Sequence, residues 1–465
     1  MNKELEDNIS KPWQVKRFEE LERQLESVYF DVDDFEEIID YYLFHGSFKQ
    51  ALNVNNYAIK LHHGSISLML KKAQLLASVN KENQALKILS EVETLEPSNQ
   101  DIFLTKGAIY SQLRHYEKAI EEYNKAISSS DELDYVYCNI AFEYENLGNF
   151  DKTLEYLGMA LDVNPDNDLA IYEAAYCFDL LSLTDEGIHF FHRLIDKNPY
   201  NVEAWFNLGV SYINAGQFEK SLEAFDYTLA IDDTHEHSWF HKGYVLNLLE
   251  RHTDAIEAFR RSIIEDELDP MKFYYLGECY EKTNDFDEAR KQYSKVIDLD
   301  SGVSDAWIGI GICELEQDNP NKALWYFEKG LEMDPGNAGY LCLVGSTYFA
   351  LGKDKESADA YEKAIEADPS DADTWLEYTE LLASEKHYRR ASDILRNAIT
   401  TIPNNHTLVY RLSAYLFFAG HEKEGMYHLE EALSDHFQGH SEILEKYPDL
   451  LLFPSYIDAI ERYRL

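Results

Sequence analysis

Apolar residues recur along the chain with the spacing of amphipathic helices. Between residues 202 and 225, a first apolar stripe at i, i+3, i+4 and i+7 consists of Trp205, Leu208, Gly209 and Tyr212. After the turn residue Gly216, a second stripe consists of Phe218, Ser221, Leu222 and Phe225. This pattern predicts two helices of about a dozen residues each, joined by a turn.

The two-helix pattern repeats every 34 residues. Small residues before a tyrosine stand at Gly107, Gly209, Gly277 and Gly345, and their separations of 102, 68 and 68 are multiples of 34. Twelve units without insertion then begin at residues 32, 66, 100, 134, 168, 202, 236, 270, 304, 338, 372 and 406. The twentieth residue of every unit is small, being Ala51, Ala85, Ala119, Thr153, Gly187, Ser221, Ala255, Ala289, Ala323, Ser357, Ala391 and Gly425.

Further positions keep the same register. The eighth residue is small in eleven units, with Ile39 as the exception, and proline closes several units, at Pro97, Pro165, Pro199, Pro335, Pro369 and Pro403. In these features residues 32–439 resemble the tetratricopeptide repeat family, in long arrays of the bacterial type. The resemblance implies an all-α fold, a right-handed α-solenoid of about twelve helix-turn-helix repeats. No unit can bury its own apolar stripe, so neighbouring units must stack.

The segments outside the repeats are predicted to be caps. In residues 1–31, one apolar helical face is formed by Trp13, Phe18, Leu21, Leu25 and Val28. Residues 440–465 predict a short helix, a proline break and a last helix from about Pro454. The sequence indicates neither a second domain nor a linker.

The family resemblance separates packing positions from binding positions. It implies that the first helices line a concave groove, with positions 2, 5, 6, 9, 12 and 13 of each unit facing it. Positions 4, 7, 8, 11, 20, 24 and 27 are expected to pack. In units four to eight the groove positions hold Tyr135, Asn139, Phe142, Glu145, Asn146, Tyr172, Tyr176, Asp179, Glu203, Phe206, Asn207, Asn214, Phe240, Tyr244, Asn247, Tyr274, Tyr275, Glu278 and Glu281.

These residues predict a peptide-binding groove. Rings supply contact area, asparagine amides match a peptide backbone, and carboxylates select Lys or Arg in the ligand. The alternative is that the rings only pack on one another. A clamp for a C-terminal carboxylate, another mode of the family, is disfavoured. The nearest basic cluster is Lys71, Lys72 and Lys106, and two of these lysines fall at packing position 7.

The net charge limits which partners the protein is expected to bind, and the cysteine content indicates its cellular compartment. Lys and Arg number 42 against 86 Asp and Glu, giving a formal charge of −44. Such a surface repels nucleic acid and anionic membranes and attracts basic proteins, although it can also serve solubility alone. The five scattered cysteines form no CxxC pair, which favours the cytoplasm. The first residues are charged and include no apolar segment, so we expect no secretory signal, and no apolar run is long enough to span a bilayer.

No motif of a known enzyme class is present, so we expect a non-catalytic adaptor or scaffold without a cofactor. His237 and His241 are four residues apart and, with Glu203 one unit earlier, define the best metal site. Surface histidines at a helix start are the simpler interpretation. Self-assembly is the second function considered, through the apolar tail residues Leu450, Leu451, Leu452, Phe453 and Tyr456, which capping explains equally well.

Overall fold

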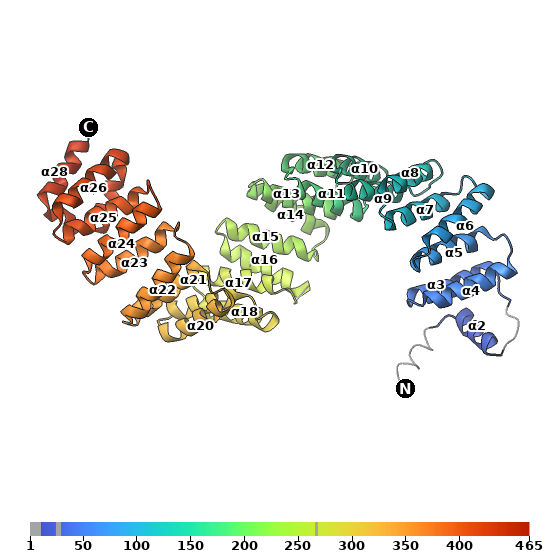
Figure 1. Ribbon diagram of the computed structural model, residues 1–465, viewed down its shortest axis with the longest axis horizontal. Coiled ribbons are helices and arrows are strands. Elements are labelled where there is room, and N and C mark those ends of the chain that lie inside the picture. The colour runs from blue at the N-terminus through green and yellow to red at the C-terminus, as the bar shows by residue number, and fades with distance from the viewer. Residues whose placement is uncertain (1–10, 25–28, 266–267, 465) are drawn as a thin grey trace. The chain divides into compact units, whose positions relative to one another are not determined.

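The computed structural model describes residues 11–24, 29–265 and 268–464, and every regular element in this part of the chain is helical. The chain divides into two compact units, one ending at Asp233 and one beginning at Thr234. In each unit the helices follow one another as packed pairs (Figure 1). We call the members of each pair the first helix and the second helix.

In the described part of the first unit, α2 (Trp13–Gln24) is followed by six pairs. Its first helices are α3 (Val32–Phe44), α5 (Ile66–Ser78), α7 (Gln100–Gln112), α9 (Leu133–Asn146), α11 (Asp168–Leu180) and α13 (Val202–Asn214). Its second helices are α4 (Phe48–Leu61), α6 (Glu82–Leu95), α8 (Tyr116–Ala126), α10 (Phe150–Val163), α12 (Thr184–Lys197) and α14 (Phe218–Ile231).

The second unit contains six pairs and a helical tail. Its first helices are α15 (Glu236–Leu248), α17 (Pro270–Lys282), α19 (Ser304–Glu316), α21 (Ala338–Ala350), α23 (Ala372–Ser384) and α25 (His406–Phe418). Its second helices are α16 (His252–Glu265), α18 (Phe286–Leu299), α20 (Pro320–Met333), α22 (Asp354–Ala367), α24 (Tyr388–Thr401) and α26 (Glu422–Asp435). The tail consists of η1 (Phe437–Gly439), α27 (His440–Lys446), η2 (Pro448–Leu452) and α28 (Pro454–Tyr463).

The helix boundaries follow the 34-residue register. Every first helix except α9 begins at the predicted first residue of its unit, and α9 begins one residue earlier. Between the two helices of each pair, the fifteenth residue has a positive φ of 55–79° in all twelve pairs. Glycine occupies this position at Gly216, whereas Arg114 and Glu250 adopt the same conformation with a side chain. The turn is therefore set by the stacking of the helices and not by glycine alone.

Small residues allow the two helices of a pair to approach closely. A Cβ added to Gly209 would lie 2.5 Å from the ring of Phe225, and one added to Gly311 would lie 2.4 Å from the ring of Phe327. In both pairs the glycine is the eighth residue and the ring is the twenty-fourth. The side chain of Ser221, the twentieth residue, is fully buried and donates a hydrogen bond to the Gly209 carbonyl at 2.8 Å. The small residues at these positions thus allow a large ring to pack directly against the backbone of the neighbouring helix.

Each second helix also packs against the first helix of the following pair within its unit. Successive first helices contact one another as well, for example α5 with α7, α11 with α13 and α17 with α19. We call the surface formed by successive first helices the first-helix face.

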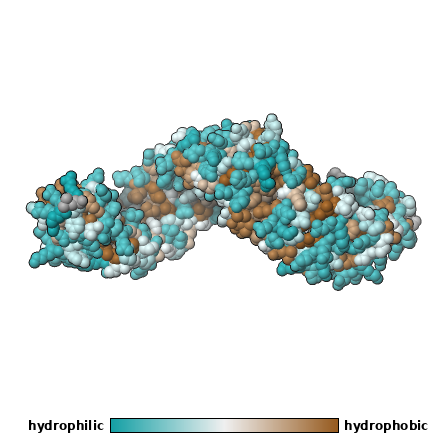
Figure 2. Space-filling view, turned by 90° about the horizontal axis from the view of Figure 1, so that it is seen from above, coloured by the Kyte–Doolittle hydropathy of each residue, from teal (hydrophilic) through white to brown (hydrophobic). Residues whose placement is uncertain are grey.

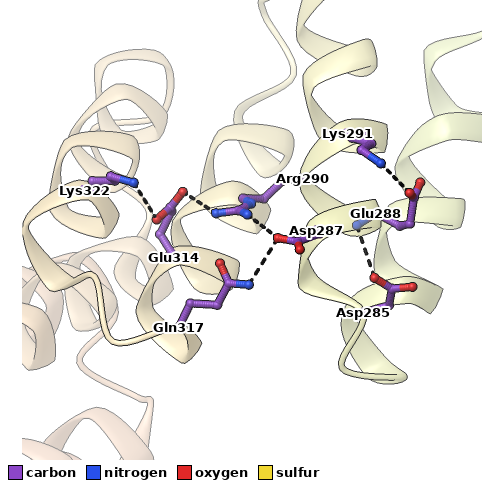
Figure 3. A network of polar contacts seen from close by, with 8 residues as sticks. All are labelled: Asp285, Asp287, Glu288, Arg290, Lys291, Glu314, Gln317 and Lys322. Carbon is purple, nitrogen blue, oxygen red and sulfur yellow. Dashed lines mark hydrogen bonds and ion pairs between the residues drawn. The ribbon is translucent and has the colours of Figure 1, made fainter.

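A polar network joins α18, α19 and α20 (Figure 3). Arg290 of α18 donates to Glu314 of α19 at 2.6 Å and also to Asp287 of its own helix. Gln317, the residue that follows α19, donates to Asp287 at 3.3 Å, and the ammonium of Lys322 of α20 lies 3.5 Å from Glu314. Because Glu314 is only 5% exposed, these contacts supply the charge compensation that a buried carboxylate needs.

The helix α2 covers one end of the first unit. Val15, Phe18 and Leu21 are buried beside Phe35 and Ile38 of α3. The prediction that Trp13 shares this face is wrong, because its side chain is 62% exposed. A residue five positions before Phe18 lies far around the helix from it, at 100° per residue. The predicted face residues Leu25 and Val28 lie outside the described residues.

The tail has the predicted order of a short helix, a break and a last helix from Pro454. Leu450 and Tyr456 are completely buried against α25 and α26, whereas Leu451 and Leu452 are 56% and 78% exposed. Phe453 is half-buried, and its ring lies 5.3 Å from that of Phe417. Of the five apolar tail residues, three therefore pack on the last pair and two face solvent.

The surface is mostly hydrophilic, with hydrophobic patches lying among the charged residues (Figure 2). No helix of the described residues is both long enough and apolar enough to cross a membrane.

Candidate functional site

Three of the predicted groove tyrosines in the first unit are open to solvent. Tyr135 on α9 is 52% exposed, and Tyr172 and Tyr176 on α11 are 68% and 47% exposed. Within the described residues, none of the three rings makes an aromatic contact with another side chain. These rings are placed on the first-helix face by positions 2, 5 and 9 of their units. They are available for contact with another molecule.

The asparagines of this region are bound mainly to their own helices. Three of them donate from the side-chain amide to the backbone carbonyl four residues earlier, at 2.8–2.9 Å: Asn139, Asn146 and Asn207. Asn214 instead donates to Asp179 of α11 at 3.1 Å. An amide carries two N–H donors, so each of these side chains keeps one N–H beyond the bond described here.

Carboxylates accompany the exposed rings. Glu173 of α11 has a raised pKa, because burial disfavours its charged form and the carboxylate of Glu145 on α9 repels it. Glu173 occupies position 6, between Asn139 and Asn207, and the sequence reasoning did not single it out. The register alone was sufficient to find it. This part of the first-helix face is therefore short of positive charge.

The two remaining aromatic residues of the first-unit set, Phe142 and Phe206, are less exposed. Phe206 is half-buried, and its ring lies 5.9 Å from that of Phe225. Phe142 is also half-buried. These two rings are less accessible than the three tyrosines.

The predicted groove rings of the second unit pack on one another. Tyr275 lies 5.8 Å from Phe240, 5.5 Å from Tyr244 and 5.5 Å from Tyr274, measured between ring centroids. It also stacks on Phe259 of α16 at 5.9 Å and 11°. Burial raises the pKa of Tyr275. Phe240, Tyr244, Tyr274 and Tyr275 therefore follow the alternative stated above, in which the groove rings pack on one another.

The polar groove residues next to this cluster already have partners. Asn247 donates to Glu278 at 3.0 Å. Its carbonyl oxygen lies 2.8 Å from Nδ1 of His252 and accepts from the thiol of Cys279 at 3.3 Å. Asn247 thus links α15 with α17, and the atoms that could bind a ligand are already bonded within the protein.

A hollow of about 510 Å³ lies on the first-helix face of the first unit. Its lining comes from α3, α5, α7 and α9, namely Glu36, Ser67, Leu70, Lys71, Gln74, Asp101, Leu104, Thr105, Ala108 and Tyr135. Every residue of this lining stands at position 2, 5, 6 or 9 of its unit, which are positions predicted to face the groove. Tyr135 is the one lining residue that also belongs to the aromatic and polar set of units four to eight.

Family models described as tetratricopeptide repeat match five segments, residues 100–132, 135–167, 190–223, 270–302 and 338–371. Three of the segments begin at residues 100, 270 and 338, which are the first residues of α7, α17 and α21. This chain is a tetratricopeptide repeat protein.

The repeat protein is also similar to solved structures. MamA is 21% identical over 35% of this chain and 95% of its own, with a TM-score of 0.34. YrrB, described as a TPR protein with an unusual peptide-binding site, is 21% identical over 42% and 97%, with a TM-score of 0.36. The APC/C hetero-tetramer Cut9-Hcn1 is 14% identical over 83% and 90%, with a TM-score of 0.42. No curated protein matches the chain by sequence.

The basic residues that argued against a carboxylate clamp are engaged in the repeat protein. Lys106 is 6% exposed and forms an ion pair with Glu93, as expected for a packing position. Lys71 pairs with Asp40 of α3. Both ammonium groups are therefore compensated within the chain.

The histidine pair has an ordinary structural setting. Nδ1 of His241 bonds the backbone carbonyl of His237 at 2.8 Å, and burial lowers the pKa of His241. The described residues contain no group of three or more His, Cys, Asp or Glu that could hold a metal ion. Glu203, the third ligand considered, belongs to the other compact unit.

Two buried positions of the repeat were missed by the packing scheme. The third residue of the unit is buried at Ala204 and Lys272, for example, and the tenth at Cys177, Cys279 and Cys313. A first helix contacts its own partner, the preceding second helix and the next first helix. Its buried arc is therefore wider than one stripe.

Proposed function

We propose that this repeat protein is a non-catalytic scaffold that binds segments of other proteins on the first-helix face of its first unit. The exposure of Tyr135, Tyr172 and Tyr176, without aromatic partners in the described residues, is the observation that supports it. Exposed tyrosines supply large, rigid contact area and are common among the residues that dominate binding energy. A soluble protein gains nothing in stability from exposing three of them.

The proposed ligand carries basic side chains beside apolar ones. Burial and, after it, the neighbouring carboxylate of Glu145 raise the pKa of Glu173, and an Arg or Lys side chain would relieve the repulsion between the two carboxylates. The second N–H of Asn139 and Asn207 can meet a peptide carbonyl.

A peptide library displayed on phage and selected against the full chain tests the proposal. We expect basic and aromatic sequences to be enriched. The best peptide should bind Tyr172→Ser/Tyr176→Ser about 100-fold more weakly, since a ring at a binding centre contributes about 2 kcal/mol or more. Tyr200→Ser is the matched control, because Tyr200 is 78% exposed in the turn before α13. Equal affinity for both variants would refute the proposal.

Self-assembly is a second candidate function, favoured by the exposure of Leu451 and Leu452 beside a well-packed cap. Light scattering of the full chain and of Leu451→Ser/Leu452→Ser tests it. An oligomer that dissociates in the variant supports assembly through the tail, and a monomer in both excludes it.

We also place the protein in a reducing compartment, the cytoplasm. All five cysteines are free thiols, and four of them are buried. Burial raises the pKa of Cys138 to about 11 and that of Cys279 to about 12, so both thiols resist oxidation. Microscopy of the tagged chain in its native cell is the direct test, and secretion would contradict the assignment.

A further inference from the structure

A second hollow lies on the first-helix face of the second unit, between α21 and α23. Its volume is about 530 Å³. Its lining residues come from three helices. Helix α21 contributes Gly339, Cys342, Leu343, Ser346 and Phe349, and α22 contributes Tyr361. Helix α23 and its N-cap contribute Asp371, Asp373, Thr374, Glu377, Glu380 and Leu381. We call this hollow the α21–α23 groove.

Two of the four carboxylates of the groove are used by the protein itself. Asp371 caps α23, accepting from the Thr374 hydroxyl at 2.6 Å and from the backbone N–H of Asp373 at 3.1 Å. Glu380 is held by Lys446 at 2.5 Å and Arg411 at 3.2 Å. Burial alone would raise the pKa of Glu380, but these two cations lower it.

The other two carboxylates, Asp373 and Glu377, have no ion-pair partner among the residues described. They lie four residues apart, on one face of α23. Glu377 has a raised pKa, first because it is partly desolvated and then because Asp371, Asp373 and Glu380 repel its charge. Asp373 and Glu377 thus lie near the carboxylates of Asp371 and Glu380 without a cation of their own among the described residues, whereas Glu380 is compensated by Arg411 and Lys446.

The rest of the lining is suited to the stem of a long basic side chain. Leu343, Phe349 and Leu381 provide apolar surface, and the Tyr361 ring forms part of the lining. Arg and Lys bury their aliphatic stems on such surface while the charged head reaches a carboxylate. Two adjacent carboxylates also match the several N–H donors of a guanidinium.

We propose that the α21–α23 groove is a second docking site, which takes an arginine side chain from an extended segment of a partner protein. The guanidinium lies between Asp373 and Glu377, and the stem lies on Leu343 and Leu381. An apolar neighbour of the arginine contacts Phe349. This site uses none of the residues of the proposed first-unit surface, and shares with that proposal only the premise that first-helix faces bind protein segments.

The test uses the full chain and two labelled peptides, GSGRLRGSG and GSGELEGSG. We expect the arginine peptide to bind and the glutamate peptide not to bind. Asp373→Asn/Glu377→Gln should weaken binding of the arginine peptide by about tenfold or more, because at least one charged hydrogen bond is lost. Asp354→Asn/Glu356→Gln removes the same charge from exposed positions on α22 and should leave the affinity within about twofold.

Cys342 provides an independent readout within the groove, because it is the one cysteine that is not buried. Bound arginine peptide should slow alkylation of Cys342 by N-ethylmaleimide, followed by mass spectrometry. Protection should vanish in Asp373→Asn/Glu377→Gln and persist in Tyr172→Ser/Tyr176→Ser. Equal affinity in the two carboxylate double variants, or binding without protection of Cys342, would overturn this site while leaving the first-unit proposal standing.

Discussion

The ring of Phe225 lies against the backbone of Gly209 so closely that a Cβ at Gly209 would be 2.5 Å from Cε1 of the ring. Phe225 is completely buried. The same contact joins Gly243 to Phe259 in the second unit. The closeness of the two helices of a pair therefore depends on the absence of one methyl group.

Gly209→Ala is expected to destabilise the first unit. Overpacking costs about 1–3 kcal/mol, which exceeds the gain of about 1 kcal/mol in helix propensity. Gly158→Ala is the matched control, because Gly158 lies within α10 and a Cβ there would meet no atom within 4 Å. It should stabilise by about 0.5–1 kcal/mol. Hydrogen exchange of α13 and α10 measures both local effects, and a change of the same sign in both variants would contradict this account.

The turn position gives a prediction of the opposite kind. Arg114 has a φ of 58°, a conformation that costs a residue with a side chain about 1–2 kcal/mol. Arg114→Gly should therefore stabilise the pair α7–α8 by about 0.5–1 kcal/mol, after allowance for the flexibility of glycine in the unfolded chain.

Gly216→Ala supplies the reverse experiment for that turn. Gly216 has a φ of 67°, and a Cβ there would touch nothing within 4 Å, so any loss is conformational and not steric. We expect a loss of about 1 kcal/mol, measured by the thermal unfolding midpoint. If Arg114→Gly lowers the midpoint as well, strain at this position is not relieved by glycine.

Much of the fold can be predicted from the sequence because every pair uses the same contacts. The small residues at positions 8 and 20 and the ring at position 24 meet within one pair, so a 34-residue period predicts the start of every first helix to within one residue. Burial of the tenth residue, as at Cys177, was not predicted. Burial of the tenth residue depends on contacts with the neighbouring pair, and one apolar stripe in the sequence does not predict those contacts.

The accessibility of the groove rings could not be predicted for a related reason. Tyr172 and Tyr275 both occupy groove positions, yet one is 68% exposed and the other stacks on Phe259. Tyr275 has Phe240 and Tyr244 on the preceding first helix, whereas Tyr172 follows the small Cys138 at the same position of α9. The residues of the adjacent helix decide between packing and exposure.

Glu143 of α9 gives a prediction about pH. It is 3% exposed, and burial raises its pKa, which a hydrogen bond from Ser111 only partly opposes. A carboxyl with a raised pKa in the folded state contributes stability below the unfolded value, about 4.5, and loses it as the pH rises through the folded value. Glu143→Gln should therefore stabilise the first unit at pH 7.

The stabilisation by Glu143→Gln should shrink toward zero below about pH 4. At that pH the carboxyl of Glu143 is protonated in the folded and in the unfolded protein, so it is as neutral as the glutamine that replaces it. Glu117→Gln is the control, because Glu117 is exposed on the neighbouring helix α8 and the same charge is removed. Urea unfolding at pH 7 and pH 3.5 measures the difference. An equal effect of the two variants at pH 7 would assign the change to net charge and not to burial.

The two kinds of groove ring can be separated by stability alone. Tyr275→Ala removes a half-buried ring from a cluster with Phe240, Tyr244 and Phe259, and should destabilise the second unit by about 2–3 kcal/mol. Tyr172→Ala removes a ring without aromatic partners in the described residues and should change stability by less than about 0.5 kcal/mol. Thermal unfolding and local hydrogen exchange measure both variants. A large loss of stability in Tyr172→Ala would mean that its ring serves packing, and the case for a binding surface on α11 would lose its main support.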